Sequence, residues 1–158
     1  MNPFQARIKT PFADLGIRLE ANRLAAVEFI HPQKEHLPDD VAGREICLRI
    51  RHYLDDPFQN DFLDIPCCYT GTPFQVKVWK ALRTIPAGQV LTYGELAKRL
   101  DTSARAVGNA CRKNPIPVVI PCHRVVAASG IGGYAGATHG SLFAIKRWLL
   151  QHEGVAVA

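Results

Sequence analysis

The chain has 158 residues, 47% of them hydrophobic and 21% charged, and its formal net charge is +5. This length permits one ordinary domain or two small ones, and the composition excludes a disordered chain. No apolar run approaches the roughly 20 residues of a membrane span, and the N-terminus lacks the apolar core of a signal peptide. We therefore expect a cytoplasmic protein with no membrane partner.

Cysteine usage and charge narrow the class further. The five cysteines form an odd set without disulfide-scaffold spacing, so reduced thiols are expected at Cys47, Cys67, Cys68, Cys111 and Cys122. No Cys/His pair has the spacing of zinc ligands, so we predict neither a metal nor another cofactor. The positive charge permits a nucleic-acid partner without proving one.

The first third of the sequence predicts strands followed by one helix. Apolar and polar residues alternate over residues 4–9 and 17–21, the period of half-buried strands, and a partner strand follows at 27–30. Apolar residues with helical spacing then predict a helix over 40–54. The prolines and glycine between 56 and 71 indicate an extended connection, which places a domain boundary near Thr70.

From Thr72 onward the pattern is helical. Thr72-Pro73-Phe74-Gln75 and Thr92-Tyr93-Gly94-Glu95 each carry the residues of a capping box, so a helix is expected after each. A tight polar turn, Asp101-Thr102-Ser103, separates the second helix from a third that ends near Lys113. Two short helices joined in this way are typical of a helix-turn-helix, although small helical proteins often contain such pairs.

The last segment begins with a glycine-rich loop over residues 129–136, which lacks the lysine of a phosphate-binding loop and is expected to be a turn. A terminal helix follows and ends at Gln151-His152-Glu153, with Gly154 as the glycine just past its end. We expect its inward face to consist of Leu142, Ile145, Trp148 and Leu149.

The most informative residues for chemistry are Cys122 and His123, in Ile120-Pro121-Cys122-His123-Arg124-Val125-Val126. A thiolate is a strong nucleophile and the imidazole is its obvious base. Neighbours in an extended chain point to opposite faces, so a turn or a bridging water is needed to bring both into one pocket. A buried, inert Cys-His pair is the alternative, and Cys111 is expected to be such a core cysteine.

The third predicted helix carries a second signal in its small outward residues and one long cation. Small residues with a projecting arginine suit a close fit into the minor groove of DNA, and the arginine could hold a base out of the duplex. A helix-helix contact made by the same small residues is an equal alternative. The residues concerned are Ser103, Ala104, Arg105, Ala106 and Gly108.

Six segments in the second half of the chain, in order and at similar spacing, resemble the O6-alkylguanine-DNA alkyltransferases. They are Gly71-Thr72-Pro73-Phe74-Gln75, Thr92-Tyr93-Gly94-Glu95-Leu96-Ala97, Ala104-Arg105-Ala106-Val107-Gly108, Asn114-Pro115-Ile116-Pro117, the segment from Ile120 to Val126, and His152-Glu153-Gly154. The resemblance runs from Gly71 to Gly154, about half the chain.

The resemblance implies a two-domain fold: a ribonuclease-H-like α/β domain over residues 1–70, and a mostly helical domain with a winged helix-turn-helix over 71–158. It implies DNA repair by irreversible, single-use transfer of an alkyl group from O6-alkylguanine, and also O4-alkylthymine, to Cys122. The partner would be double-stranded DNA bound by a monomer, with cooperativity on DNA left open. The non-catalytic branch of this family lacks the cysteine nucleophile.

The resemblance also implies residue roles. Cys122 would be a thiolate, with a water-bridged relay through His123 to Glu153, and Asn114 would brace the turn before the active site. Arg105 would replace the flipped nucleotide. The residues expected around the guanine are Tyr93, Val125, Tyr134 and Ala135.

The sequence departs from the family pattern at a shortened glycine-rich loop and at an apparent insertion over residues 138–141, which leaves the size of the alkyl pocket open. Two functions of other classes are alternatives. A helix-turn-helix regulator or damage-recognition protein would bind DNA with an unmodified cysteine. A Cys-His hydrolase would turn over repeatedly through an acyl-enzyme.

Overall fold

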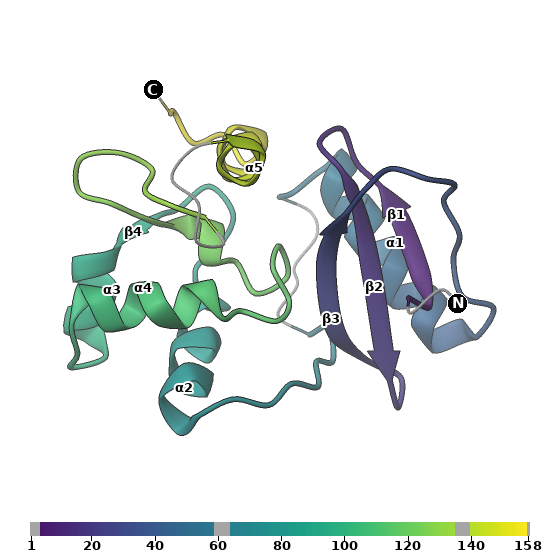
Figure 1. Ribbon diagram of the computed structural model, residues 1–158, viewed down its shortest axis with the longest axis horizontal. Coiled ribbons are helices and arrows are strands. Elements are labelled where there is room, and N and C mark those ends of the chain that lie inside the picture. Colours follow the sequence, from purple (N-terminus) through teal and green to yellow (C-terminus); the bar gives the residue numbers. More distant parts are fainter. Residues whose placement is uncertain (1–3, 59–63, 135–139, 158) are drawn as a thin grey trace. The chain divides into compact units, whose positions relative to one another are not determined.

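The computed structural model describes residues 4–58, 64–134 and 140–157. The chain divides into two compact units, Met1–Thr70 and Gly71–Ala158. Figure 1 follows the chain from the strands of the first unit to the helices of the second. Within the described ranges there are five α-helices and five short strands, so the mixed α/β content that was predicted is present.

The first unit contains a three-stranded antiparallel sheet in the order β1-β2-β3, with β1 at Ala6–Lys9, β2 at Asp14–Glu20 and β3 at Arg23–Ile30. The hairpin between β2 and β3 turns at Ala21 and Asn22, whose φ angles are 49° and 62°. Positive φ at both central residues matches the twist of the flanking strands. Ala21 was predicted to continue the strand pattern, but it lies exposed in this turn.

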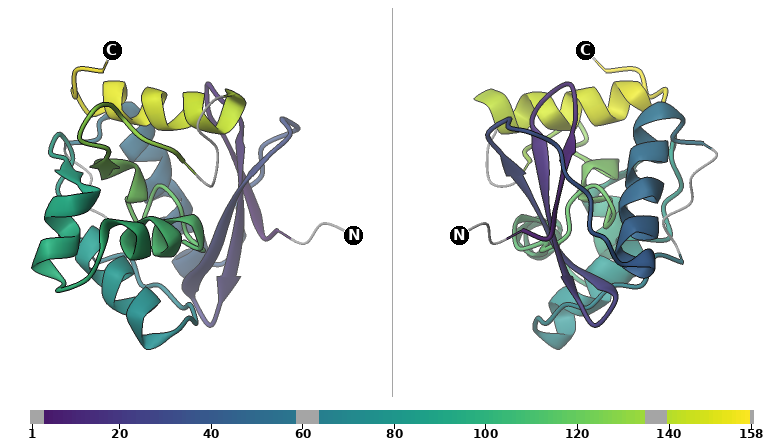
Figure 2. Two further views of the ribbon diagram at one scale, coloured as in Figure 1. Left: turned by 60° about the vertical axis from the view of Figure 1, so that its left-hand side comes forward. Right: turned by 90° about the vertical axis from the view of Figure 1, so that its right-hand side faces the viewer.

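Helix α1, Val41–Asp55, packs against β1 of the same unit. Figure 2 shows the helix lying alongside the sheet. Its N-cap is Asp40, whose carboxylate accepts a hydrogen bond from the Gly43 amide at 2.7 Å. Its buried face includes Ile46, Ile50 and Tyr53, as the spacing predicts.

Arg7 of β1 differs from the sequence pattern, which placed it on a polar face. Its side chain is buried and contacts Asp14 at 3.4 Å, and it donates to the carbonyl of His31 at 2.9 Å. The Asp14 carboxylate also accepts the Gln33 amide at 2.8 Å. The segment that follows β3 and contains His31 and Gln33 contacts this side of the sheet. The charge of Arg7 is therefore buried and paired, although the strand pattern places it outward.

The second unit contains α2 (Pro73–Leu82), α3 (Tyr93–Arg99), α4 (Ala104–Arg112) and α5 (Gly140–His152). Both predicted capping boxes are formed, at Thr72 with Gln75 and at Thr92 with Glu95. Two features were not predicted. They are a one-turn 3₁₀ helix, η1, at Cys122–Arg124, and a parallel pair of strands, β4 (Leu91–Thr92) and β5 (Val125–Val126).

Helices α3 and α4 are joined by a tight turn of four residues, Leu100 to Ser103, one residue longer than predicted. Asp101 adopts a left-handed conformation with φ of 55°, and the Ser103 hydroxyl caps α4 by accepting the Ala106 amide at 3.1 Å. The indole of Trp79 on α2 donates to the carbonyl of Ala110 at 2.9 Å, which fixes α4 against α2. Helix α4 is therefore supported by α2 and α3, which leaves its opposite side free to face outward.

Helix α5 is buried along one stripe that differs slightly from the predicted one. Ile145 and Leu149 are buried as expected, whereas Leu142 and Trp148 are half-buried. Lys146 is fully buried within this stripe. Among the described residues, no helix is long and apolar enough to cross a lipid bilayer.

Candidate functional site

The segment that carries Cys122 forms a tight turn. The Cys122 amide donates to the carbonyl of Ile120 at 2.8 Å, and the Arg124 amide donates to that of Pro121 at 3.0 Å. With about three residues per turn, a 3₁₀ helix spreads successive side chains around its axis instead of alternating them across a strand. Cys122 and His123 can therefore face the same site, which neighbours in an extended strand cannot do.

A buried cluster of charged side chains lies beside the thiol. His123 Nε2 is 2.8 Å from Glu153 Oε2, and the guanidinium of Arg124 donates to both oxygens of the same carboxylate at 2.9 Å each. A third nitrogen of Arg124 donates to the carbonyl of Ile85 at 2.6 Å. His123 and Glu153 come from η1 and from the C-terminal end of α5, 30 residues apart in sequence.

The charge states of this cluster follow from its burial. Burial alone would raise the pKa of Glu153, but the interactions with His123 and Arg124 outweigh it and hold that pKa well below its usual range. Burial lowers the pKa of His123, against the opposing effect of Glu153. At neutral pH the carboxylate is therefore ionised and the imidazole is neutral, with its Nε2 hydrogen donated to Glu153.

This tautomer leaves Nδ1 of His123 as an acceptor. Nδ1 is buried, and among the described residues it has no hydrogen-bond partner. A buried acceptor of this kind normally binds a water molecule or a proton donor. His123 can thus accept a proton on the nitrogen that Glu153 does not hold.

Asn114 connects the end of α4 to the turn that carries Cys122. Its side-chain nitrogen donates to the carbonyl of Ile120 at 2.8 Å, and its side-chain oxygen accepts the amide of Ile116 at 2.9 Å. Between these anchors, Val118 has a φ of 75°, a strained conformation for a β-branched residue. The segment is therefore held by Asn114 in a shape that it would not adopt alone.

Cys122 itself is 6% exposed. Burial raises the pKa of its thiol, while a hydrogen bond from Asn114 and the positive charge of Lys146 lower it. Ionisation of the sulfur thus depends on these neighbours. Cys111, predicted to be fully buried, is half-buried, and burial followed by the charge of Cys122 raises its pKa.

The residues expected around the guanine lie close to the turn. Tyr93 begins α3, and its hydroxyl donates to the carbonyl of Gly133 at 3.4 Å. Val125 is buried in β5, and Tyr134 is buried within the glycine-rich loop. Gly132 has a φ of 76°, and a Cβ there would lie 3.1 Å from the Tyr93 ring, so only glycine fits. Ala135 and the first two residues of the apparent insertion lie outside the described residues.

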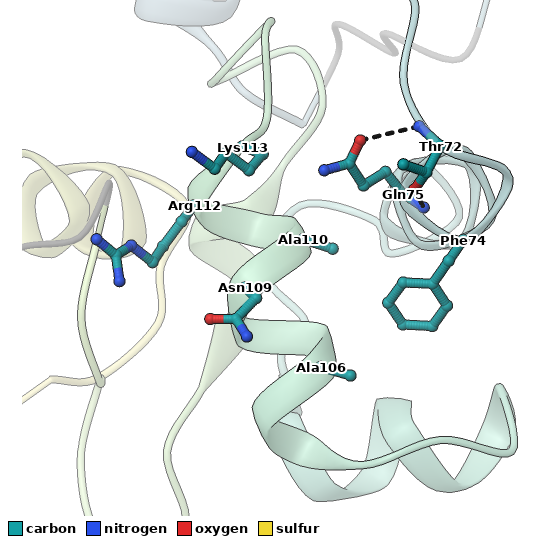
Figure 3. Close-up of a pocket in the computed structure, with 8 residues that line it drawn as sticks. All are labelled: Thr72, Phe74, Gln75, Ala106, Asn109, Ala110, Arg112 and Lys113. Atoms are coloured by element: carbon teal, nitrogen blue, oxygen red, sulfur yellow. Dashed lines mark hydrogen bonds between the residues drawn. The ribbon is translucent and has the colours of Figure 1, made fainter.

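The small residues of α4 divide between two faces. Figure 3 shows Ala106 and Ala110 pointing toward α2 across a hollow of about 480 Å³. Ser103, Ala104 and Arg105 are exposed, and a Cβ added at Gly108 would meet nothing within 4 Å. Ala106 therefore faces this hollow, whereas the other four predicted residues border solvent. The hollow is lined by Thr72, Phe74, Gln75, Ala106, Asn109, Ala110, Arg112 and Lys113.

Two site residues were missed by the sequence reasoning. Arg124 was quoted in the motif without a role, and it holds the carboxylate of Glu153 through two nitrogens. Lys146 was passed over as an ordinary helix residue, although it lies between Leu142 and Leu149 on the apolar stripe of the terminal helix. A lysine in such a stripe is the signal that could have identified it. Over the residues with described positions, no group of three or more acidic, His or Cys side chains is arranged to hold a metal ion.

Comparisons with known proteins agree on one family. A family model described as "6-O-methylguanine DNA methyltransferase, DNA binding domain" matches residues 73–155. The methylated-DNA–protein-cysteine methyltransferase of Metallosphaera sedula is 35% identical over 145 residues, which cover 92% of this chain and 89% of the relative. The protein of that name from Shigella flexneri is 53% identical over 93 residues, or 57% of this chain, and the match spans 52% of that relative.

Solved structures give the same result. The crystal structure of a variant of the Mycobacterium tuberculosis O6-methylguanine methyltransferase matches with a TM-score of 0.77 and 33% identity, covering 96% of this chain and 93% of that chain. The structure of the M. tuberculosis protein in complex with DNA matches with a TM-score of 0.69 and 31% identity, covering 94% and 91%.

Proposed function

The chain belongs to the family of methylated-DNA–protein-cysteine methyltransferases, and from this premise we propose that it repairs DNA by taking the alkyl group of O6-alkylguanine onto Cys122. Family membership follows from the model that matches residues 73–155 and from the relative aligned over 92% of the chain. O4-alkylthymine is a second substrate of the same chemistry. DNA as the partner follows from the matching structure that contains it.

The two units have separate tasks in this proposal. Residues 71–158 bind DNA and carry out the transfer through a winged helix-turn-helix, supported by the capped α3-α4 pair and by the small β4-β5 pair behind it. Residues 1–70 are a ribonuclease-H-like domain without that activity, supported by the antiparallel strands and their covering helix. The protein acts as a monomer on double-stranded DNA.

The reaction is a displacement at carbon. The sulfur of Cys122 forms a bond to the alkyl carbon while the bond from that carbon to O6 of guanine breaks, and the electron pair stays on the base. The thiol proton passes through a water molecule to His123, and the leaving guanine ring takes up one proton from the hydroxyl of Tyr93. The proton held by His123 returns to Tyr93 through water, so both residues end in their starting protonation states. The net change exchanges a proton and an alkyl group between sulfur and guanine, with no other reactant.

The buried cluster supports the roles of His123 and Glu153. The carboxylate fixes the imidazole tautomer so that Nδ1 accepts the thiol proton, and it stabilises the imidazolium that forms. Arg124 keeps Glu153 ionised in a buried place. Asn114 acts on the same turn by holding the carbonyl of Ile120 and by donating a hydrogen bond to Cys122.

The target base must leave the duplex, because Cys122 is buried and cannot reach an atom inside the base stack. Arg105 is exposed on α4 and fills the space left by the flipped nucleotide. Ser103, Ala104 and Gly108 let the helix approach the minor groove closely. The extruded guanine is bounded by Tyr93, Val125, Tyr134 and Ala135, and the hydroxyl of Tyr93 protonates the ring.

The observation that carries this function is the hydrogen bond between His123 and Glu153, directly after a buried cysteine on a turn that Asn114 braces from the end of α4. The test is a time course with excess O6-methylguanine duplex, followed by intact mass measurement. Product should equal protein and then stop, with one added methyl group in the peptide that contains Cys122, because a thioether has no hydrolytic route back.

The same measurement separates the other functions. Tight DNA binding with an unmodified Cys122 would favour a regulator or damage-recognition protein. Product formation beyond one equivalent, or turnover of esters or amides, would favour a hydrolase. Either result would overturn the transfer function.

A further inference from the structure

Asn109 is an exposed amide on the outward face of α4 to which the proposed mechanism gives no role. Arg105, Asn109 and Arg112 are all exposed, and their spacing of four and then three residues places them in one row along the helix. Figure 3 shows that the Asn109 side chain does not turn toward α2, in contrast to those of Ala106 and Ala110. The row therefore presents an amide between two guanidinium groups.

Asn109 adds little to the stability of α4. No hydrogen bond joins its side chain to another residue that the structure describes, whereas Asn114 uses both ends of its amide in the turn before Cys122. Asparagine and glycine are among the poorer helix formers, and Gly108 and Asn109 stand next to each other in the middle of α4. These two residues therefore serve a purpose other than forming the helix.

The place of Asn109 in the row sets what it can reach on a duplex. In the proposed function α4 enters the minor groove, and Arg105 fills the space of the flipped nucleotide. Side chains four residues apart on a helix have Cβ atoms about 5–6 Å apart, and successive base pairs are about 3.4 Å apart. Asn109 is therefore within reach of a base pair one or two steps from the flipped nucleotide.

The groups beside Asn109 divide the contacts to DNA between them. Arg112 and Lys113 are exposed at the end of α4 and suit phosphates, because a cation attracts a phosphate at any sequence. A Cβ at Gly108 would meet no atom within 4 Å, so the helix presents open space beside Asn109. A neutral amide gains little from phosphates, but it carries an acceptor oxygen and two N–H donors. Base edges offer partners for both.

The minor groove presents one feature that an amide can read. A·T and T·A pairs show only acceptors there, whereas a G·C pair adds the N2 amino group of guanine, which is a donor. The amide nitrogen of Asn109 can donate to an acceptor of any pair, but its oxygen finds a donor only at G·C. At A·T this oxygen faces acceptors and is left without a partner. An asparagine here therefore discriminates between two classes of base pair.

We propose that Asn109 is a specificity-determining residue of the DNA-binding helix, which reads the N2 amino group of a guanine within two base pairs of the damaged base. This assignment rests on the proposed transfer function and adds a sequence preference to it. O6-alkylguanine near a G·C pair at this position is repaired faster than the same lesion near an A·T pair. Arg105 acts at the lesion, and Asn109 acts on its neighbour in the duplex.

The test combines one change in the protein with one change in the DNA. Each duplex carries O6-methylguanine and has guanine or inosine at one position within two base pairs of it, in either strand. Inosine lacks the N2 amino group and still pairs with cytosine. The second-order rate constant of single-turnover transfer is measured for wild type and N109A. At one position, the ratio of the guanine rate to the inosine rate should be about fivefold or more higher in wild type than in N109A.

The ratio also removes the main side effect of inosine. Its weaker pairing with cytosine changes base extrusion equally for both proteins, so this effect cancels. Q151A, which removes an exposed amide from α5, should keep the wild-type ratio. Equal slowing of N109A on all duplexes would assign Asn109 to a phosphate contact, and unchanged rates would remove it from the interface. Either result would overturn the proposal.

A binding measurement does not depend on transfer. The Kd values of C122S and of the double variant C122S/N109A are measured for the same guanine and inosine duplexes. The ratio of the inosine Kd to the guanine Kd should be larger in C122S than in the double variant. A ratio that does not depend on residue 109 would overturn the role of Asn109, whereas a wild-type protein that transfers no methyl group would instead remove the proposed function. The two failures are thus distinguishable.

Discussion

The proposed transfer site, formed by Cys122, His123 and Glu153, and the outward face of α4 differ sharply in burial within one unit. Cys122, His123 and Glu153 are each at most 6% exposed, and the polar side chains among them are held by short hydrogen bonds. Ser103, Ala104 and Arg105 are exposed, and Gly108 borders open space. Chemistry on an alkyl group needs fixed geometry and little water, whereas approach to a duplex needs a surface that presents few obstacles.

The difference predicts two classes of variant. Changes in the buried site should alter the chemistry and, where they unpair a charge, the folding free energy. Changes on the outward face should alter only the handling of duplex DNA. A buried-site variant that alters only the handling of duplex DNA, or an outward-face variant that alters the chemistry, would contradict this division.

The largest effect is expected for Cys122→Ser. Its hydroxyl is not ionised near neutrality, so transfer should be abolished, while binding to methylated duplex should stay near the wild-type value because α4 is unchanged. Mass spectrometry and a binding titration measure the two properties. Cys111→Ser is the control for a neighbouring thiol and should keep transfer. Residual transfer in the Cys122 variant would identify a different nucleophile, with Cys111 the first to examine.

The second effect is expected for Glu153→Gln. Removal of the carboxylate charge leaves the buried guanidinium of Arg124 unpaired, which should reduce the free energy of unfolding by about 3–5 kcal/mol. Transfer should also slow, because His123 loses the group that stabilises its cation. Chemical denaturation and single-turnover rates measure the two effects.

Asp14→Asn is a matched control in the first unit, where Asp14 is buried beside Arg7. It should also lower the free energy of unfolding, but transfer per folded molecule should remain at the wild-type rate. A similar loss of transfer in both variants would mean that general destabilisation, and not the relay, explains the Glu153 result.

The sequence predicted these two regions unequally. The helix starts at Thr72 and Thr92 and the turn before Ser103 were predictable, because capping residues act within four positions of the chain. The strands β4 and β5 have two residues each, too few for any alternation to be visible. Their pairing depends on tertiary structure, so local patterns could not predict it.

Within the site, Cys122 and His123 could be singled out from residue chemistry, but their partners could not. Glu153 lies 30 residues from His123 and was one of 14 acidic residues, so only the family resemblance selected it. Lys146 was missed because its burial depends on contacts with three separate segments. Contacts of this kind depend on how the helices pack, and local sequence patterns do not predict that packing.

A smaller and more selective effect is expected for Arg105→Ala on the outward face. If Arg105 compensates the unstacking of one base, worth a few kcal/mol, repair of duplex DNA should slow by about 10–100-fold. Reaction with the free base O6-benzylguanine should be nearly unchanged, because no extrusion is needed. Arg105→Lys should repair duplex DNA at a rate between those of the wild type and Arg105→Ala. Equal slowing on both substrates would place Arg105 in the pocket or in the fold.

The smallest effect on the fold, and the sharpest test of the outward face, is expected at Gly108. A methyl group there meets no atom within 4 Å, so Gly108→Ala should leave the protein as stable or raise its stability by up to about 1 kcal/mol through helix propensity. Gly108→Glu should fold as well, yet a carboxylate facing the phosphates should weaken duplex binding, most strongly at low salt. Transfer from free O6-benzylguanine should be the same in both variants, since Gly108 touches neither Cys122 nor its relay. If Gly108→Glu binds duplex DNA at low salt as tightly as the wild type does, this face of α4 does not meet DNA. The division between buried chemistry and exposed recognition would then be wrong for the exposed face.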